Sequence, residues 1–249
     1  MTASSWTQAP SHLDPPVEEI HVFCAALDLS LEAAAGLERV LAEDERARAR
    51  RFHFARDRIR YVVGRARLRE ILGRYLRVDP ASVVLRYGRQ GKPMLATGHD
   101  DDPGPRFNAS GADGLALLAF HAKDEVGIDL ERVHAVPDAL LIAQSQFTAD
   151  EHGALQALPP SEREAGFFRV WTRKEAVVKS TGLGFSQPID SFTVPVAPDD
   201  GPEGVRLAVS GRPVHRWLLP VPPPAPGFLA ALAFAGEPNP VRCWTWPVE

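Results

Sequence analysis

The stretch VGIDLERV, residues 126–133, alternates apolar residues with glycine and acidic residues. This two-residue period predicts a β-strand, and it places Asp129 and Glu131 on the same face of that strand. Two carboxylates at this spacing repel each other unless a cation lies between them. The stretch therefore predicts a strand that carries either a solvated acidic face or a cation site.

A second charged motif lies in WTRKEAVVKSTGLG, residues 171–184, within a helix expected over residues 161–181. Trp171, Glu175 and Lys179 follow one another at four-residue steps, so they share one face of this helix. Taken alone, the pair of Glu175 and Lys179 is typical of a solvent-exposed helix surface. In combination with the acidic strand, the helix offers a third carboxylate and a cation.

Asp129, Glu131 and Glu175 together would supply oxygen ligands of the kind that Mg²⁺ prefers. The arginines described below and Lys179 indicate a phosphate-rich molecule as the second ligand. The sequence contains no Walker loop, glycine-rich dinucleotide fingerprint, HExxH motif or GxSxG motif, and its eight histidines show no metal-ligand spacing. Zinc-dependent chemistry and Ser–His–Asp hydrolysis therefore have no support.

The composition is that of an ordinary globular protein, with 249 residues, 45% hydrophobic and 24% charged. Cys24 and Cys243 lie near opposite ends and form no disulfide pattern, which favours a reducing compartment. The first residues lack the features of a secretory signal, and no apolar run approaches the ~20 residues that span a bilayer. We therefore expect a cytoplasmic protein without a membrane segment.

The segment 46–69 contains ten arginines and a single acid, Asp57. Such a segment forms either a solvated helix face or an anion site, because arginine suits bidentate contacts with phosphate. Nucleic acid is the less favoured ligand, since no aromatic stacking platform accompanies the arginines and the net charge is −4.

Local patterns predict the order of the elements. The sequence favours a flexible segment over 1–19, a strand over 20–27, one or two helices over 30–52 and a helix over 56–77. It next favours a strand over 82–88 and a hairpin of strands 115–120 and 126–131. The last expected elements are helices over 147–158 and 161–181 and strands over 205–209, 215–219, 228–235 and 241–246. Capping patterns place helix starts at Ser30, Thr148 with Glu151, and Ser161 with Glu164, and a helix end at Gly182.

The order of strand, helix, basic helix and strands occurs twice, with a break near residue 122. Only faint similarity links FHFARDRIRYVVGRA to FFRVWTRKEAVVKST. The residues alone therefore leave a duplicated architecture open.

The two charged motifs resemble the paired signatures GIDxE and WxxKEAxxKxxG of 4′-phosphopantetheinyl transferases of the surfactin-synthetase-activating (Sfp) type. Both signatures are complete here, in VGIDLE and WTRKEAVVKSTGLG. Supporting matches are RRFHFARDRIRYVVGR at 50–65, GKP at 91–93, FNAS at 107–110 and PIDSFTV at 188–194. The resemblance covers residues 40–195.

The resemblance implies an α+β fold of two similar α/β halves with antiparallel sheets, related by a pseudo-twofold axis with the active site between them. The halves would be residues 20–122 and 123–249, the second carrying the metal ligands. It implies an enzyme that uses coenzyme A and Mg²⁺. A chain that holds both halves needs no second subunit, so we expect a monomer, although the sequence leaves the oligomeric state open. A serine hydroxyl of an apo acyl or peptidyl carrier protein would attack the β-phosphate, and adenosine 3′,5′-bisphosphate would leave. Relatives of this length often serve peptide or polyketide synthases in secondary metabolite biosynthesis.

Carried over position by position, the resemblance implies that Asp129, Glu131 and Glu175 bind magnesium. Glu175, or a water that it holds, would accept the proton of the serine. Lys179 would contact the pyrophosphate of coenzyme A and stabilise the leaving group. Glu175 and Lys179 are thus the expected catalytic residues.

The expected coenzyme A contacts are Lys92 in the GKP motif, Arg48 and Arg60 near the 3′-phosphate and adenine, and Ser110. One departure concerns the segment that usually reads serine-histidine-serine, because Gly111 stands at the position of the phosphate-binding histidine. The phosphate contact is then either absent or supplied by another group. Arg106 and His121 are near in sequence but are not strong candidates, and the backbone N–H of Gly111 could still contact phosphate.

Two alternatives remain open at this point. The missing histidine favours a member that has lost transfer and serves as a coenzyme A or carrier-protein binding module. The acids alone are also compatible with a magnesium-dependent phosphoesterase.

Overall fold

The computed structural model describes residues 6–88, 91–96, 104–182, 187–198 and 201–246. Its helices are α1 (Leu31–Leu37), α2 (Glu43–Ala49), α3 (Ala55–Leu76), α4 (Ala139–Gln146), α5 (Ala149–Ala157) and α6 (Arg163–Thr181). Its strands are β1 (Thr7–Gln8), β2 (Ile20–Ala26), β3 (Leu85–Tyr87), β4 (Pro93–Leu95), β5 (Arg106–Ala112), β6 (Leu115–His121), β7 (Val126–Arg132), β8 (Glu203–Val209), β9 (Arg212–Leu219), β10 (Phe228–Phe234) and β11 (Val241–Thr245). None of the helices in these ranges is long and apolar enough to cross a membrane.

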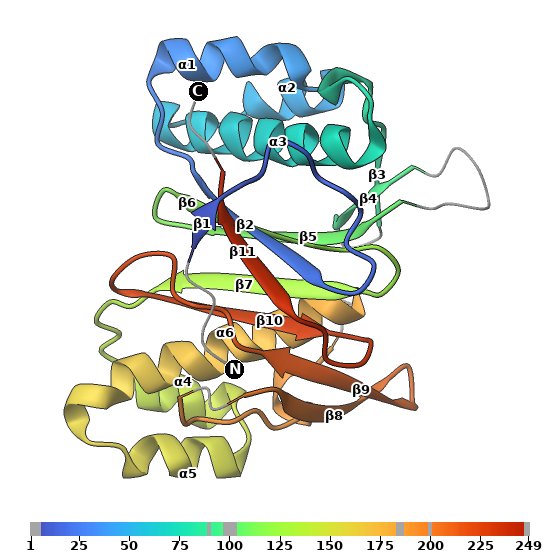
Figure 1. The fold of residues 1–249 in the computed structure, drawn as a ribbon. Helices are drawn as coiled ribbons and strands as arrows, with labels where there is room; N and C mark the ends of the chain where they lie inside the picture. The colour runs from blue at the N-terminus through green and yellow to red at the C-terminus, as the bar shows by residue number, and fades with distance from the viewer. Residues whose placement is uncertain (1–5, 89–90, 97–103, 183–186, 199–200, 247–249) are drawn as a thin grey trace.

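The elements form four layers, with two sheets inside and helices outside (Figure 1). The first sheet has the order β1-β11-β2-β6-β5, and helices α1 to α3 cover its outer face. The second sheet has the order β7-β10-β9-β8, with every neighbour antiparallel, and α4 to α6 lie on its outer side. The expected class, mixed α and β with antiparallel sheets, is confirmed.

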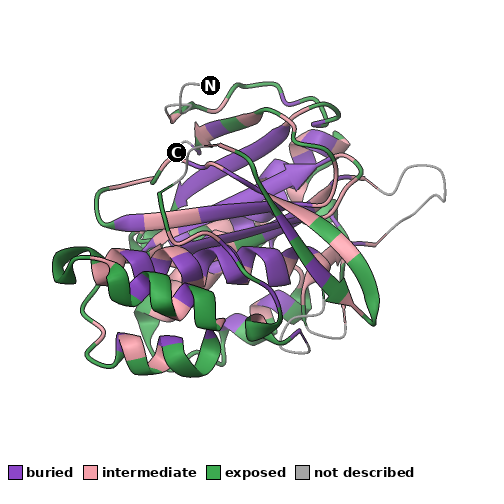
Figure 2. Cartoon of the chain, turned by 90° about the horizontal axis from the view of Figure 1, so that it is seen from below, coloured by how far each residue is buried: buried purple, intermediate pink, exposed green. Residues whose placement is uncertain are grey.

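The core follows from alternation along the strands. On β2, Val22 and Cys24 point into the layer between the two sheets, where they meet residues such as Ile128 of β7. Phe23 and Ala25 point the other way, into the layer beneath α3. Because both faces of the central strands are covered, these strands are buried nearly throughout, as Figure 2 shows.

One predicted pairing is wrong. The segments 115–120 and 126–131 do not form a hairpin, because β6 pairs with β2 and β5 whereas β7 pairs with β10 in the other sheet. The hairpin partner of β6 is β5, through a tight turn at Asp113 and Gly114, both with positive φ. The short link 122–125 instead carries the chain from one sheet to the other, which buries the apolar residues of both strands between the layers.

Most of the predicted helix ends are confirmed. Ser30 and Thr148 cap α1 and α5 through their side chains, and Gly182 ends α6 with a φ of 71°. The cap predicted at Ser161–Glu164 is wrong, because α6 begins at Arg163. Pro159 and Pro160 begin a 3₁₀ turn over Pro160–Glu162, and Ser161 is part of this turn.

Residues 1–5 of the segment expected to be flexible lie outside the described part. In the remainder, β1 pairs in parallel with β11, and the side chain of Leu13 is buried in the core beneath α3. The indole N–H of Trp6 donates to the carbonyl of Pro222 at 3.2 Å. In the structure this part of the segment is therefore held against the first sheet.

Candidate active site

The edges of the two sheets meet at β5 and β7. The backbone N–H of Ile128 on β7 donates to the side-chain oxygen of Asn108 on β5 at 2.9 Å. This bond takes the place of a continuous ladder between the two strands. It brings the outer face of β7, which carries Asp129 and Glu131, next to the side chains of β5.

Helix α6 lies against that same face of β7, and Gly127 allows the close approach. A Cβ atom at Gly127 would overlap the carbonyl oxygen of Ala176 and the backbone nitrogen of Ser180. The glycine therefore sets the distance between the acidic strand and the helix that carries Glu175 and Lys179.

Replacing Gly127 by alanine should lower the free energy of unfolding by about 1–3 kcal/mol or more, because backbone atoms must move to admit the methyl group. Urea denaturation measures this loss. The control is Gly153→Ala in α5, where a Cβ meets nothing within 4 Å, and which should stabilise by about 0.5–1 kcal/mol. Equal stability of the Gly127→Ala variant and the parent would contradict the close approach.

Three of the expected site residues are in direct contact. Lys179 donates to Oδ1 of Asp129 at 2.5 Å and to Oγ of Ser110 at 3.1 Å. Ser110 in turn donates to the same Oδ1 at 2.8 Å. Asp129 is only 3% exposed, and its second oxygen, Oδ2, is buried without a hydrogen-bond partner among the described residues.

Glu131 and Glu175 complete the acidic group. Burial raises the pKa of Glu131, and the charges of Asp129 and Glu175 raise it further. The charges of Lys179 and His134 lower this pKa and so oppose the shift. Burial likewise raises the pKa of Glu175, with Lys179 opposing the shift and Asp129 adding to it. The three carboxylates therefore feel one another's charge, and ionising the two glutamates is disfavoured in the protein alone.

In the arrangement described, no three His, Cys, Asp or Glu side chains among the described residues are gathered closely enough to hold a metal. The donor set nevertheless fits a hard divalent cation. Within the described part of the chain, the buried Oδ2 of Asp129 has no hydrogen-bond partner, and unpaired buried polar atoms are costly. A cation bound there would also remove the penalty on charging Glu131 and Glu175.

Lys92 directly precedes β4, and its side chain extends to this region. Its ammonium group donates to Oε2 of Glu125 at 3.0 Å and to the backbone carbonyl of Lys179 at 3.1 Å. The GKP lysine thus lies beside the C-terminal end of α6, next to the lysine expected to contact pyrophosphate.

Arg48 and Arg60 make their described contacts elsewhere. The guanidinium of Arg48 lies over the ring of Tyr61 at 5.4 Å, and Arg60 forms a bidentate ion pair with Asp28 at 2.6 and 2.8 Å. Gly111 is exposed on β5, and a Cβ there would meet the carbonyl oxygen of Leu115 at 3.3 Å. A side chain at this position would need only a small adjustment of its neighbour.

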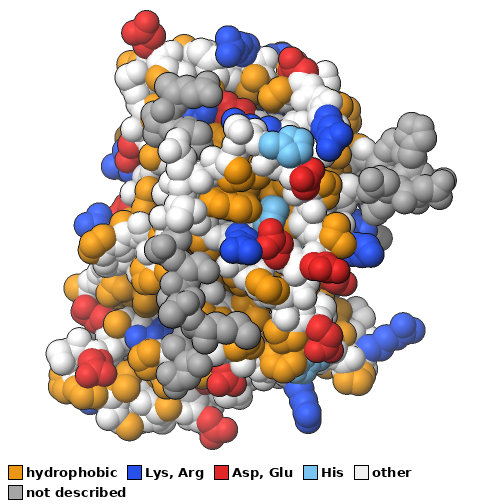
Figure 3. Space-filling model, viewed as in Figure 1, with side chains coloured by type: hydrophobic (Ala, Val, Ile, Leu, Met, Phe, Trp, Pro, Cys, Tyr) orange, Lys and Arg blue, Asp and Glu red, His pale blue; other side chains and the backbone are white. Residues whose placement is uncertain are grey.

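Much of the arginine-rich segment 46–69 pairs with acids of the protein itself. Glu45 is buried and accepts from both Arg65 and Arg69, and Glu43 pairs with Arg46 and Arg50. On the face drawn in Figure 3, basic and acidic side chains are likewise interspersed. From the sequence, these arginines could form either a solvated helix face or an anion site. The pairings give several of them a structural role instead.

The comparisons with known proteins match both regions that build this site. A family described as "4'-phosphopantetheinyl transferase, N-terminal" matches residues 30–123, and the "4'-phosphopantetheinyl transferase superfamily" matches residues 125–219. The 4′-phosphopantetheinyl transferase HetI of Nostoc sp. is 34% identical over 236 residues, covering 95% of this chain and 96% of that protein.

The chain belongs to the 4′-phosphopantetheinyl transferase family.

Two further relatives agree with this assignment. The 4′-phosphopantetheinyl transferase Sfp of Bacillus subtilis is 29% identical over 183 residues, 74% of this chain and 78% of that protein. A phosphopantetheinyl transferase of Thraustochytrium sp. is 33% identical over 175 residues, 64% of this chain and 59% of that protein. In this transferase, Ser110 comes from the first matched region and Asp129 and Lys179 come from the second, so both regions contribute to one cluster.

The buried position of Lys174, which directly precedes Glu175, was not predicted from the sequence. Its ammonium group is buried and donates to the carbonyls of Ile189 at 2.7 Å and Phe192 at 2.6 Å. It also pairs with Glu151 at 2.9 Å. Burial lowers the pKa of Lys174, and the bond to Glu151 opposes that shift. The sequence did contain a sign of this burial, because Lys174 lies at helical spacing from the apolar residues Val170 and Val178.

Proposed function

We propose that this transferase moves the 4′-phosphopantetheine arm of coenzyme A to a serine of an apo acyl or peptidyl carrier protein. The reaction forms a bond between the serine oxygen and the β-phosphorus and breaks the bond from that phosphorus to the bridging oxygen. Adenosine 3′,5′-bisphosphate leaves with that oxygen. The cluster of Asp129, Ser110 and Lys179, with the two glutamates beside it, carries the proposal because it unites metal-binding and phosphate-binding groups.

Asp129, Glu131 and Glu175 are the proposed magnesium ligands. Magnesium, when bound, would neutralise the pyrophosphate and stabilise the charge that develops during transfer. Oδ2 of Asp129, which has no hydrogen-bond partner among the described residues, supports its part, and the raised pKa of both glutamates supports theirs. Glu175 is also the proposed acceptor of the serine proton, directly or through a water that it holds, since a carboxylate with a raised pKa is a better base.

Lys179 is proposed to exchange partners during the cycle. In the protein alone its ammonium group neutralises Asp129. When coenzyme A and a cation are bound, Lys179 would be free to donate to the pyrophosphate and to the leaving oxygen. Ser110, which contacts both residues, is proposed to hold Asp129 in place and to contact the cofactor.

The nucleotide of coenzyme A, with its 3′-phosphate, is assigned to basic groups of the first matched region. We propose that Lys92 lies beside the nucleotide, because it contacts the backbone of Lys179. Arg48 and Arg60 are proposed to approach the 3′-phosphate and the adenine, which for Arg60 means loosening its pair with Asp28. Gly111 would offer its backbone N–H to a phosphate in place of the family's histidine.

The proposal includes the architecture of the molecule. Residues 20–122 and 123–249 would be two similar halves about a pseudo-twofold axis, preceded by the segment 1–19. The long helices α3 and α6, each packed on the outer face of one sheet, support this reading. One chain supplies both sides of the site, so we propose a monomer acting in the cytoplasm.

A transfer assay tests the proposal. The full chain is incubated with coenzyme A, Mg²⁺ and a panel of apo acyl and peptidyl carrier proteins, and intact carriers are weighed by mass spectrometry. We expect a carrier to gain one phosphopantetheine arm with equimolar release of adenosine 3′,5′-bisphosphate, and we expect EDTA to prevent both. Carriers that bind without gaining mass would favour a binding module, and phosphate release from coenzyme A without a carrier would favour a phosphoesterase.

A further inference from the structure

A separate cavity of about 360 Å³ lies at the C-terminal end of α3. Its charged walls come from one face of that helix, at Arg67, Glu70, Arg74 and Arg77, and Trp246 closes it from beyond β11. Neither the transfer reaction nor any expected coenzyme A contact uses these residues.

The cavity lies away from the candidate active site. Trp246 follows β11, and its backbone N–H donates to the carbonyl of Cys24 on β2 at 2.7 Å. In the first sheet β2 and β6 separate β11 from β5, which carries Ser110. A molecule bound beside Trp246 would therefore lie on the side of the first sheet opposite β5, the strand that contacts the acidic cluster through Ser110.

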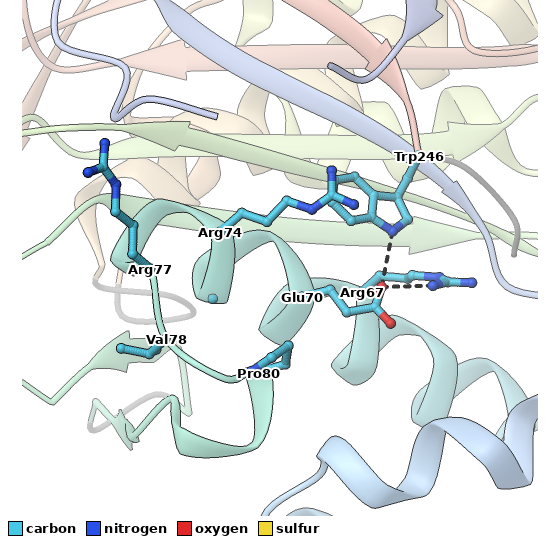
Figure 4. A pocket seen from close by; sticks show the side chains of 8 residues that line it. Arg67, Glu70, Arg74, Arg77, Val78, Pro80 and Trp246 are labelled. Atoms are coloured by element: carbon cyan, nitrogen blue, oxygen red, sulfur yellow. Dashed lines mark hydrogen bonds and ion pairs between the residues drawn. The ribbon is translucent and has the colours of Figure 1, made fainter. Parts of the chain in front are cut away.

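Hydrogen bonds fix the walls of the cavity. One oxygen of Glu70 accepts from Nη1 of Arg67 at 2.7 Å and from the indole N–H of Trp246 at 3.0 Å. The guanidinium of Arg74 lies over the Trp246 ring, 4.5 Å from its centroid. Figure 4 shows the Arg74 guanidinium against the Trp246 ring, and dashed lines that join Glu70 to Trp246 and to Arg67.

The lining carries more positive charge than its own acid neutralises. Three arginines and a single carboxylate line the cavity. Arg77 is exposed and forms a long ion pair with Asp14 at 3.6 Å, and Arg74 also donates to the carbonyl of Pro10 at 3.3 Å. Arginine offers five N–H donors, and the described hydrogen bond of Arg67 uses one of them. The negative end of the α3 dipole accounts for basic residues in the last turn, but Arg67 lies more than two turns earlier.

The backbone at the rim also departs from the usual helix end. Arg77 adopts a left-handed conformation with a φ of 56°, at the position after the helix where glycine is the usual residue. A residue with a Cβ atom is strained in this conformation. The sequence thus keeps a guanidinium at the mouth of the cavity although glycine would be less strained.

We propose that this cavity binds a small molecule through a phosphate monoester group. The excess of two positive charges in the lining matches a phosphate dianion, and planar guanidinium groups bind phosphate in a bidentate manner. The volume lies in the range of small-molecule sites, of the order of 300–1,000 Å³. Because the cavity is remote from the acidic cluster, occupancy would act on the transferase from outside its active site.

The probe is glycerol 3-phosphate, titrated into the full chain labelled with 5-fluorotryptophan and observed by ¹⁹F NMR at constant ionic strength. The chain has five tryptophans, and Trp246→Phe identifies the resonance that belongs to the cavity. We expect a saturable shift of the Trp246 resonance, with glycerol and chloride producing none. The Trp171 resonance, on α6, reports separately on phosphate at the candidate active site.

Variants decide whether the arginines are responsible. Arg74→Gln should weaken binding about tenfold, as expected for one lost charged hydrogen bond, and the exposed Arg77→Gln should weaken it severalfold without affecting folding. The control Arg56→Gln removes an arginine of the same helix, 71% exposed and outside the cavity, and should change nothing. No shift of the Trp246 resonance, or a shift unchanged in both cavity variants, would overturn the proposal. Either outcome is independent of the transfer assay.

Discussion

Replacing Glu175 by glutamine should reduce phosphopantetheine transfer by about 10²–10⁴-fold while making the metal-free protein more stable at neutral pH. The loss of rate is the contribution expected of a general base, to which the loss of a magnesium ligand adds. Intact-mass assays of the carrier give the rate, and thermal denaturation in EDTA gives the stability. A surface glutamate would show neither effect.

The gain in stability follows from the raised pKa of Glu175. As pH rises, the unfolded chain releases this proton before the folded protein does, so stability falls between the two pKa values and stays low above them. Glutamine does not ionise, and the variant escapes this loss. Below the ordinary carboxyl pKa, about 4.3, Glu175 is uncharged in both the folded and the unfolded parent. The difference in stability between variant and parent should therefore disappear.

Magnesium provides the matching control for this prediction. Added Mg²⁺ should raise the melting temperature of the parent more than that of Glu175→Gln, because the variant has lost one oxygen ligand. Glu164→Gln, near the start of the same helix, removes a similar charge outside the cluster and should leave transfer unchanged. If Glu175→Gln transferred at the parental rate, the proposed roles of this carboxylate would be wrong.

Replacing Lys174 by methionine should lower the free energy of unfolding by about 3–5 kcal/mol, because it leaves the carboxylate of Glu151 buried without its cation. Glu151 also accepts from the backbone N–H groups of Thr148 and Val194, so the damage reaches α5 and the chain after α6. The midpoint of urea denaturation measures the effect.

The control for this variant is Lys123→Met, at an exposed position between β6 and β7. It removes the same charge and should change stability by less than about 0.5 kcal/mol. A similarly small effect for Lys174→Met would show that the buried pair contributes little. Because Lys174 anchors the helix turn that carries Glu175, we also expect the surviving folded fraction to transfer more slowly.

The sequence predicted what depends on local pattern. Alternation in VGIDLERV gave the strand β7, and four-residue steps gave the face of α6 that carries Glu175 and Lys179. Signature motifs then indicated the family, which the relatives confirmed. Local pattern could not assign β6 and β7 to different sheets, because strand pairing depends on which partners far along the chain cover each face.

The contacts within the site were harder to foresee than its members. The motifs named Ser110, Asp129 and Lys179, but their mutual hydrogen bonds arise only where β5 meets β7. The role of Gly127 and the buried position of Lys174 were likewise not predicted, because both depend on backbone from distant segments. The metal ligands and coenzyme A contacts remain predictions.

The position of β11 has a consequence for how the chain is made. This strand lies far along the chain from β2, yet it pairs in parallel with β2 inside the first sheet and also pairs with β1. During translation one side of β2 must stay unpaired until β11 has left the ribosome. Pairings between such distant segments form slowly, and until this pairing forms the edge of β2 stays exposed. Nascent chains that stop short of β11 should therefore be the ones most prone to aggregate and most dependent on chaperones.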